Sequence, residues 1–192
     1  MERSFALTNH PSTPTDAVDR IEARLRRNPG GVLAVTFSLQ GDLARVRIPD
    51  TRPRRMTDHL WQHTCFEVFI GVDGTSAYHE FNLSPSGEWM AHAFQRYRQG
   101  GPLADETLAP QIRVSRSDHG IELEAVIELD RLSADYAGAQ LRIGPCTVVE
   151  ETNAALSYWS VRHPSGKPDF HHLQVFAVQL AAPDVDAGRD PR

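Results

Sequence analysis

One carboxylate stands in an otherwise apolar run and is the first candidate for chemistry. In CFEVFIGV, Phe66 and Val68 fall on one face of an extended chain, and Cys65 and Glu67 fall on the other. Because both faces carry bulky residues, the strand is expected to be covered on both sides. A carboxylate in such a place needs a partner or a ligand. Residues 60–97, which contain this run, are therefore predicted to form one wall of a binding site.

Flat aromatic side chains near this strand indicate what the site could bind. Trp61 lies just before the strand, and Trp159 lies in the run SYWSVRH. A pocket for a planar ligand or a sugar ring needs flat apolar faces and a few well-placed polar groups. We expect Trp61 and Trp159 to stack on such a ligand, whereas Trp89, which alternates with alanines, is predicted to be core. The side chains that could supply its hydrogen bonds are Glu67, Asn82, Arg162 and Lys167.

A polar loop late in the chain is the second candidate element of the site. Residues 163–172 read HPSGKPDFHH, in which two prolines restrict the backbone and a glycine permits a turn. Such a loop beside Trp159 could form the rim of a pocket. His163, Lys167 and His171 are its predicted ligand contacts.

The sequence also offers enzymatic and metal-binding alternatives. Glu67 and Glu80 could act as the paired carboxylates of a glycosidase, and His171 with His172 could serve an enzyme that uses the late loop. The chain has no Gly-rich phosphate loop and no G-x-S-x-G motif. His59 and His63 have the i,i+4 spacing of a helical zinc site, but this stretch leads straight into a strand, and the late histidines have no acid or cysteine at a standard ligand spacing. We therefore predict a non-catalytic protein without a metal ion.

The bulk composition is that of an ordinary globular protein. The chain has 192 residues, 40% of them hydrophobic, and a formal net charge of −5, which argues against a nucleic-acid partner. Its two cysteines, Cys65 and Cys146, lie in apolar runs and are expected to be buried free thiols. There is no apolar run of membrane-spanning length and no secretory signal pattern, so a cytoplasmic location is expected. The sequence indicates no oligomeric state.

The elements that must position these residues are predicted to be strands. Short alternating runs with turn signals between them predict about ten strands in an all-β, antiparallel β-sandwich of the jelly-roll kind. One short amphipathic helix is expected from residue 16 to residue 28, after an irregular lead-in at residues 1–15 in which Phe5 and Leu7 could add a short edge strand. The Gly41-Asp42 pair predicts a hairpin into a strand at residues 43–48. The domain is expected to span residues 16–180, and residues 181–192 have the composition of a disordered tail.

Three sequence blocks together resemble a known group of domains. LWQHTCFEVFIGVDG, YHEFNLSPSGEWMAHAF and YWSVRHPSGKPDFHH are similar to the DOMON-like domains related to type 9 carbohydrate-binding modules, over about residues 30–180. The resemblance implies a β-sandwich that binds a sugar or haem and catalyses nothing. It also implies that Trp61 stacks on the sugar and that Glu67 contacts its hydroxyl groups. Asn82 and Trp159 would add a polar contact and a second stacking ring.

The haem-binding and electron-transfer members of that group offer an alternative function. Haem needs axial ligands such as methionine and histidine. Met56, Met90, His92 and His163 are available, but Met90 and His92 would share one strand face. No resident cofactor is therefore predicted. The expected partner is a small molecule, with a sugar preferred.

Overall fold

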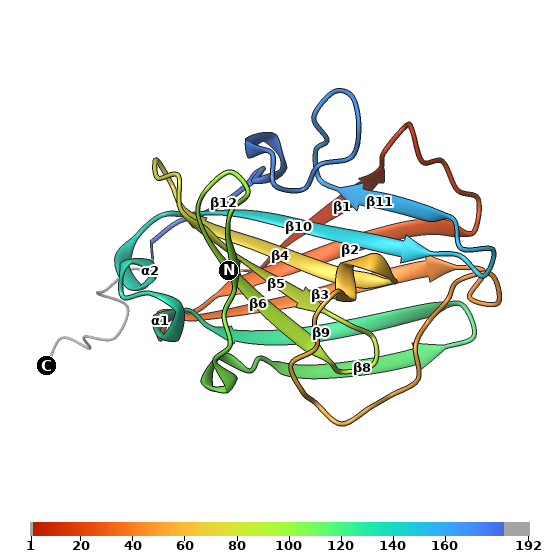
Figure 1. Ribbon diagram of the computed structural model, residues 1–192, viewed down its shortest axis with the longest axis horizontal. Helices are drawn as coiled ribbons and strands as arrows, with labels where there is room; N and C mark the ends of the chain where they lie inside the picture. Colours follow the sequence, from red (N-terminus) through yellow and green to blue (C-terminus); the bar gives the residue numbers. More distant parts are fainter. Residues whose placement is uncertain (1, 183–192) are drawn as a thin grey trace, which may run out of the picture.

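Antiparallel strands make up most of the protein (Figure 1). The computed structural model describes residues 2–182. Sheet A contains five strands in the order β1-β2-β3-β9-β8: β1 (Glu2–Asn9), β2 (Val18–Arg27), β3 (Val32–Gly41), β9 (Gly120–Glu128) and β8 (Gln111–Ser117). In sheet B the strands follow the order β7-β6-β5-β4-β10-β11: β7 (Gln99–Pro102), β6 (Trp89–Arg96), β5 (Tyr78–Leu83), β4 (Cys65–Val72), β10 (Leu141–Glu150) and β11 (Leu156–Ser160).

The first strand belongs to both sheets. Its residues 2–7 pair with β2 in sheet A, and its last two residues pair with β11 in sheet B. The short strand β12 (Val178–Leu180) pairs with the start of β10. The two sheets are thus one hydrogen-bonded surface that folds back on itself, and the predicted antiparallel β-sandwich is confirmed.

The core lies between the two sheets. Apolar side chains alternate along each strand, and the inward set forms one cluster that takes in strands of both sheets. Phe37 of β3 and Phe66 of β4 stack across the sandwich with ring centroids 5.1 Å apart. Trp89 is fully buried and stacks on Phe81, as predicted for a core residue. Cys65 and Cys146 are buried free thiols, also as predicted.

In the described part of the chain, helical structure is confined to short turns. The α-helical pieces are α1 (Leu129–Leu132) and α2 (Asp135–Gly138), and the 3₁₀ turns are η1 (Leu60–Gln62), η2 (Glu106–Leu108) and η3 (Leu173–Val175). Within residues 2–182, no helix has the length and apolar character needed to cross a membrane.

The prediction of a helix at residues 16–28 is wrong, because this segment forms β2. Ile21, Ala23 and Leu25 point inward with the period of two that a strand requires. The pairing register of β2 shifts between Val18 and Arg20, which inserts one extra residue. The apolar spacing from Val18 to Ile21 therefore becomes three, and with Leu25 four residues later the pattern imitates a helix.

Two further expectations are corrected by the sheet topology. Residues 2–9 are the strand β1 rather than an irregular lead-in, so the sandwich begins before residue 16. Residues 43–48 are not a strand, because β3 already pairs with β2 and β9, and only Val46 makes an isolated bridge, to Glu151. Of the predicted tail, residues 183–192 lie outside the described residues.

The stacked pair in the core gives a stability prediction. We expect Phe66→Ala to lower the free energy of unfolding by about 3–5 kcal/mol, because it removes a fully buried ring and leaves a cavity. Leu173→Ala is the control, since that side chain is 68% exposed and should change stability by less than about 0.5 kcal/mol. Urea unfolding followed by tryptophan fluorescence measures both. Equal effects of the two substitutions would contradict this placement of the core.

Candidate functional site

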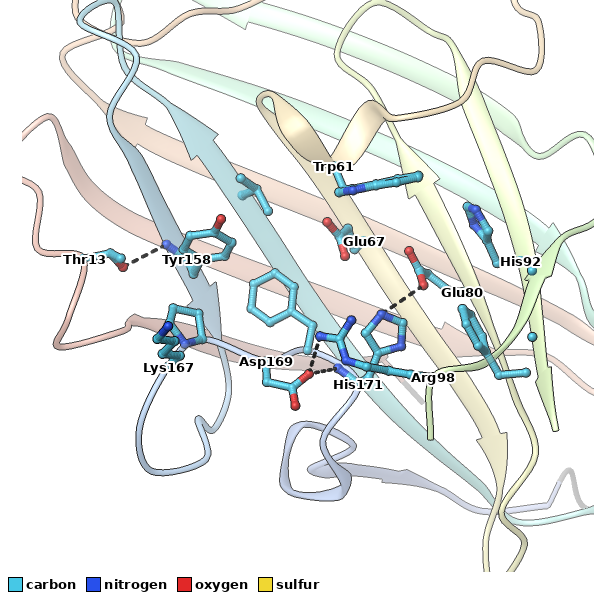
Figure 2. Close-up of a pocket in the computed structure, with 16 residues that line it drawn as sticks. Thr13, Trp61, Glu67, Glu80, His92, Arg98, Tyr158, Lys167, Asp169 and His171 are labelled. Carbon is cyan, nitrogen blue, oxygen red and sulfur yellow. Dashed lines mark hydrogen bonds and ion pairs between the residues drawn. The ribbon is translucent and has the colours of Figure 1, made fainter. Parts of the chain in front are cut away.

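A pocket of about 610 Å³ lies on the face of sheet B that points away from the core (Figure 2). Its floor is formed by outward side chains of five adjacent strands, Glu67, Glu80, His92, Val148 and Tyr158 among them. Trp61 of η1 closes one side, and residues 167–171, here called the loop wall, close another. Pockets of this volume suit small-molecule ligands.

The floor follows from strand alternation. On β4, Phe66 and Val68 enter the core, whereas Glu67 points to the opposite face, as the sequence predicted. Glu67 pairs in register with Asn82 of β5, and Glu80 pairs with His92 of β6. Glu80 and Asn82 are two residues apart on β5, so they share a face. The pairing thus gathers two carboxylates, an amide and an imidazole on one patch of sheet.

A 3₁₀ turn anchored from below positions Trp61. Its neighbour Leu60 is buried and packs with Cys65 and Met90 under the turn. Trp61 stays partly exposed, and its ring meets the ring of His92 edge-on with centroids 5.5 Å apart. An indole ring over a polar floor is a geometry suited to stacking on a flat ligand.

Aromatic packing holds the loop wall against sheet B. The ring of Phe170 is buried and contacts Phe69 and Tyr158, with centroids 6.4 and 5.7 Å away. The imidazole of His171 meets Phe94 edge-on at 5.0 Å and shares a 2.9 Å hydrogen bond with the hydroxyl of Tyr78. These contacts order the loop wall before any ligand arrives.

An ion pair ties the loop wall to the turn that follows β6. Arg98 Nη2 donates to Asp169 Oδ1 at 2.8 Å, and the Tyr97 hydroxyl donates to Asp169 Oδ2 at 2.7 Å. Arg98 has a left-handed backbone conformation (φ 53°), and its amide donates to the hydroxyl of Tyr78. The turn and the loop wall therefore form one connected rim.

Burial controls the charge of the floor. It raises the pKa of Glu67 well above the usual value for a glutamate, and the neighbouring charge of Glu80 raises it further. Burial also raises the pKa of Glu80 to about 7, although the hydrogen bond from Asn82 and the charge of Arg98 act in the opposite direction. Near neutral pH the two carboxyl groups therefore hold at least one proton between them.

The histidines of the pocket are neutral. Burial, followed by repulsion from Arg98, lowers the pKa of His171 to about 4. Burial also lowers the pKa of His92. The Nε2 atom of His171 lies 3.8 Å from Glu80 Oε2, which is beyond hydrogen-bond distance. Because the ring is uncharged, this contact is not an ion pair at neutral pH.

The structure brings together four of the eight residues proposed from the sequence. Trp61, Glu67, Lys167 and His171 all line the pocket (Figure 2). Asn82 is fully buried behind the floor, where its Nδ2 donates to Glu80 Oε1 at 2.6 Å. Its position makes it a support for a carboxylate rather than a direct ligand contact.

The other three expected contacts lie elsewhere, which corrects the sequence-based site. Trp159 is 6% exposed, belongs to the core cluster, and donates from Nε1 to Ser157 Oγ at 3.0 Å. Strand alternation turns Tyr158 to the pocket, so the next residue must face the core. Arg162 is exposed outside the pocket lining. The Nε2 atom of His163 lies 2.8 Å from the carbonyl oxygen of Thr8, also outside the lining.

Several lining residues were not proposed as ligand contacts from the sequence. The sequence indicated Glu80 only as a paired glycosidase carboxylate and His92 only as a haem ligand, although the alternation of Tyr78, Glu80 and Asn82 marks one face of β5. Arg98 and Asp169 are 71 residues apart, and no local pattern joins them. The remaining lining residues that were missed are Thr13, Phe94, Gly100, Gly101, Val148, Tyr158, Pro168 and Phe170.

Comparison with known proteins shows similarity at the level of the fold. No model of a known protein family matches the chain, and no curated protein matches it. The structure is similar to that of a proposed carbohydrate-binding protein from Bacteroides uniformis, with a TM-score of 0.65 and 14% identity, over 91% of this chain and 83% of that one. It is also similar to a type 9 carbohydrate-binding module from Caldicellulosiruptor kristjanssonii in complex with cellotriose, with a TM-score of 0.51 and 13% identity, over 94% and 83%.

The raised carboxyl pKa values predict how stability depends on pH. A folded pKa above the unfolded value stabilises the protein fully below the unfolded value, here 4.5, and this contribution is lost as pH rises through the folded value of about 7. For Glu80 the loss is roughly 3 kcal/mol between pH 4.5 and pH 8. We expect Glu80→Gln to remove this contribution from the pH dependence of the unfolding free energy, measured with denaturant across that range, while the contribution of Glu67 remains.

The control for this measurement is a carboxylate that is exposed on the other sheet. Glu124→Gln alters an exposed side chain of β9 and should leave the pH slope of the wild type unchanged. Parallel curves for the wild type and Glu80→Gln would show that Glu80 is not held protonated in the folded state.

Proposed function

We propose that the protein is a non-catalytic carbohydrate-binding module that holds a sugar ring in the pocket on sheet B. The observation that carries this proposal is the position of the Trp61 indole at the side of a floor built from hydrogen-bonding groups (Figure 2). Sugar rings present apolar C–H faces and polar hydroxyl edges. A site with aromatic sides and a polar floor matches both.

Aromatic rings other than tryptophan complete the apolar surface. Phe94, Tyr158 and Phe170 line the same pocket as Trp61. We propose Tyr158 for the second stacking role that the sequence suggested for Trp159, because Tyr158 is the member of that pair on the pocket face. Phe170 is already held in place by its packing on Tyr158, so little side-chain conformational entropy is lost when a ligand binds against it.

The floor suits hydroxyl groups because it can both accept and donate hydrogen bonds. A carboxyl group that holds a proton donates from one oxygen and accepts at the other. Glu67, Glu80 and the neutral imidazole of His92 together present both kinds of group. Sugar hydroxyls also act as both donor and acceptor, so each can be matched.

The same floor argues against glycoside hydrolysis. A glycosidase needs one carboxyl group held protonated and a second held ionised as base or nucleophile. Here the pKa values of Glu67 and Glu80 are both raised, and neither is held ionised by a nearby cation strongly enough to reverse the shift. The likeness in fold to a module that holds cellotriose supports a binding role by analogy.

Replacing Trp61 tests the stacking role. We expect Trp61→Ala to weaken sugar binding by roughly thirtyfold, the loss of a residue worth about 2 kcal/mol of binding free energy. Stability should fall by less than about 1 kcal/mol, since the side chain is partly exposed on a short turn. A glycan array identifies the sugar, and isothermal titration calorimetry with that sugar measures affinity.

Trp159→Ala is the comparison for this experiment. It should lower the free energy of unfolding by about 3 kcal/mol or more, because the ring is part of the core. A sharp loss of stability in Trp61→Ala instead would mean that Trp61 is a structural residue. Failure of every glycan on the array to bind would overturn the proposed function.

We also propose that the protein works without haem. Axial ligands must approach haem iron from opposite sides, whereas Met90 and His92 are two residues apart on one strand and share its face. Purified protein mixed with haemin is expected to show no Soret band other than that of free haem. A shifted, stoichiometric Soret band would contradict this.

A further inference from the structure

One buried carboxylate in the pocket lacks a partner of its own. The side chain of Glu67 is 3% exposed and faces the pocket (Figure 2), and its Oε1 atom has no hydrogen-bond partner within residues 2–182. The charged group that acts on it is Glu80, which carries the same sign. Leaving such a group without a partner of opposite charge is costly.

The cations at the pocket are not placed to compensate Glu67. Arg98 is already paired with Asp169 at 2.8 Å. Lys167 lies at the loop end of the pocket on the side of Asp169, whereas Glu67 and Glu80 lie together on the floor near Trp61 (Figure 2). Neither cation lowers the pKa of Glu67.

The other titratable groups around Glu67 carry no positive charge. The imidazoles of His92 and His171 are neutral because their pKa values are lowered by burial. Burial raises the pKa values of three further groups, which therefore stay protonated and uncharged: the thiols of Cys65 and Cys146 and the hydroxyl of Tyr158. Glu67 thus has no cation that lowers its pKa, and the cation that acts on Glu80, Arg98, is already paired with Asp169.

We propose that the sugar bound here carries a protonated amine, so that the ligand is an amino sugar whose ammonium group lies against Glu67 and Glu80. This inference rests on the proposed carbohydrate-binding function and names the class of sugar. An ammonium offers three donors and forms charge-assisted hydrogen bonds with carboxylates. The rings of Trp61 and Phe94, which line the same pocket, favour a cation over their faces.

The binding reaction should release protons. A cation next to the floor favours the ionised carboxylates and lowers their pKa values on binding. At pH 6.5 the free site holds its protons, since the pKa of Glu80 is about 7 and that of Glu67 is also raised. The amine of the ligand remains charged at this pH, because ordinary amino groups of this kind titrate near 8. A neutral sugar has no reason to displace those protons.

The test compares matched sugars by isothermal titration calorimetry at pH 6.5 with the full chain. The pairs are glucose with glucosamine, galactose with galactosamine, and mannose with mannosamine, with N-acetylglucosamine as an uncharged amide. We expect at least one amino sugar to bind about tenfold more tightly than its neutral partner. Repeating the titration in buffers of different ionisation enthalpy should show proton release for the amino sugar and none for the neutral sugar.

Two substitutions assign the preference to the floor. Glu67→Gln keeps the shape of the protonated side chain and should reduce the preference for the amine, measured as the ratio of the two affinities in the same variant, to less than about threefold. Glu80→Gln should reduce it in the same direction and serves as the second variant should the first fail to fold. Glu124→Gln, on the exposed face of sheet A, should leave the preference unchanged.

The outcomes separate the two proposals. Equal or tighter binding of the neutral sugars, or an amine preference that survives in both floor variants, would overturn the amino-sugar inference while leaving carbohydrate binding in place. Absence of binding by every sugar of the panel and by every glycan on the array would overturn both proposals.

Discussion

Sheet B has to be covered on both of its faces, and the arrangement of the site depends on this constraint. The inner face packs against sheet A, and the outer face lies under η1 and the loop wall. The outer cover is held by buried aromatic side chains, including Phe170 and Phe176, which pack on Phe69. Any polar group that alternates to the outer face of β4 or β5 is therefore removed from bulk water. The unusual charge state of the floor follows from this burial rather than from a dedicated catalytic arrangement.

Burial and support act on the two carboxyl groups in different ways. Glu80 receives a hydrogen bond from Asn82 and a long-range contribution from Arg98, and both limit the rise of its pKa. Glu67 receives neither, and its side chain is the least compensated of the pocket. The pocket is thus asymmetric, with a supported acid beside an unsupported one. A ligand that enters the pocket therefore meets two chemically different carboxyl groups, and this difference distinguishes one end of the floor from the other.

Part of this site could be predicted from the sequence because strand alternation is a local signal. The opposite faces of Phe66 and Glu67 follow from a period of two that runs without interruption through β4. The same reasoning failed at β2, where the extra residue near Val18 breaks the period and imitates a helix. It was also insufficient at β11, which is covered on both sides. Tyr158 and Trp159 are adjacent aromatic residues, so a contrast between polar and apolar side chains does not indicate which of them faces the ligand.

Contacts between distant segments could not be predicted at all. The rim depends on the ion pair between Arg98 and Asp169, which are 71 residues apart. Local sequence patterns do not predict which residues at such a separation meet. The same limit applies to Thr13, which follows β1 and yet lines a pocket whose floor comes from residues between 67 and 158.

The shared strand β1 has a consequence for how the molecule forms. Thr8 pairs with Ser160, so the first strand cannot join sheet B until the chain has been made as far as residue 160. Pairings of such long sequence separation make folding slow, since loop closure must precede the contacts that stabilise it. During synthesis the edge of β1 stays without its second neighbour, and such unpaired edges favour association with other chains. Because the loop wall follows β11 in the chain, the pocket is expected to form later than the pairing of β2, β3, β9 and β8 in sheet A.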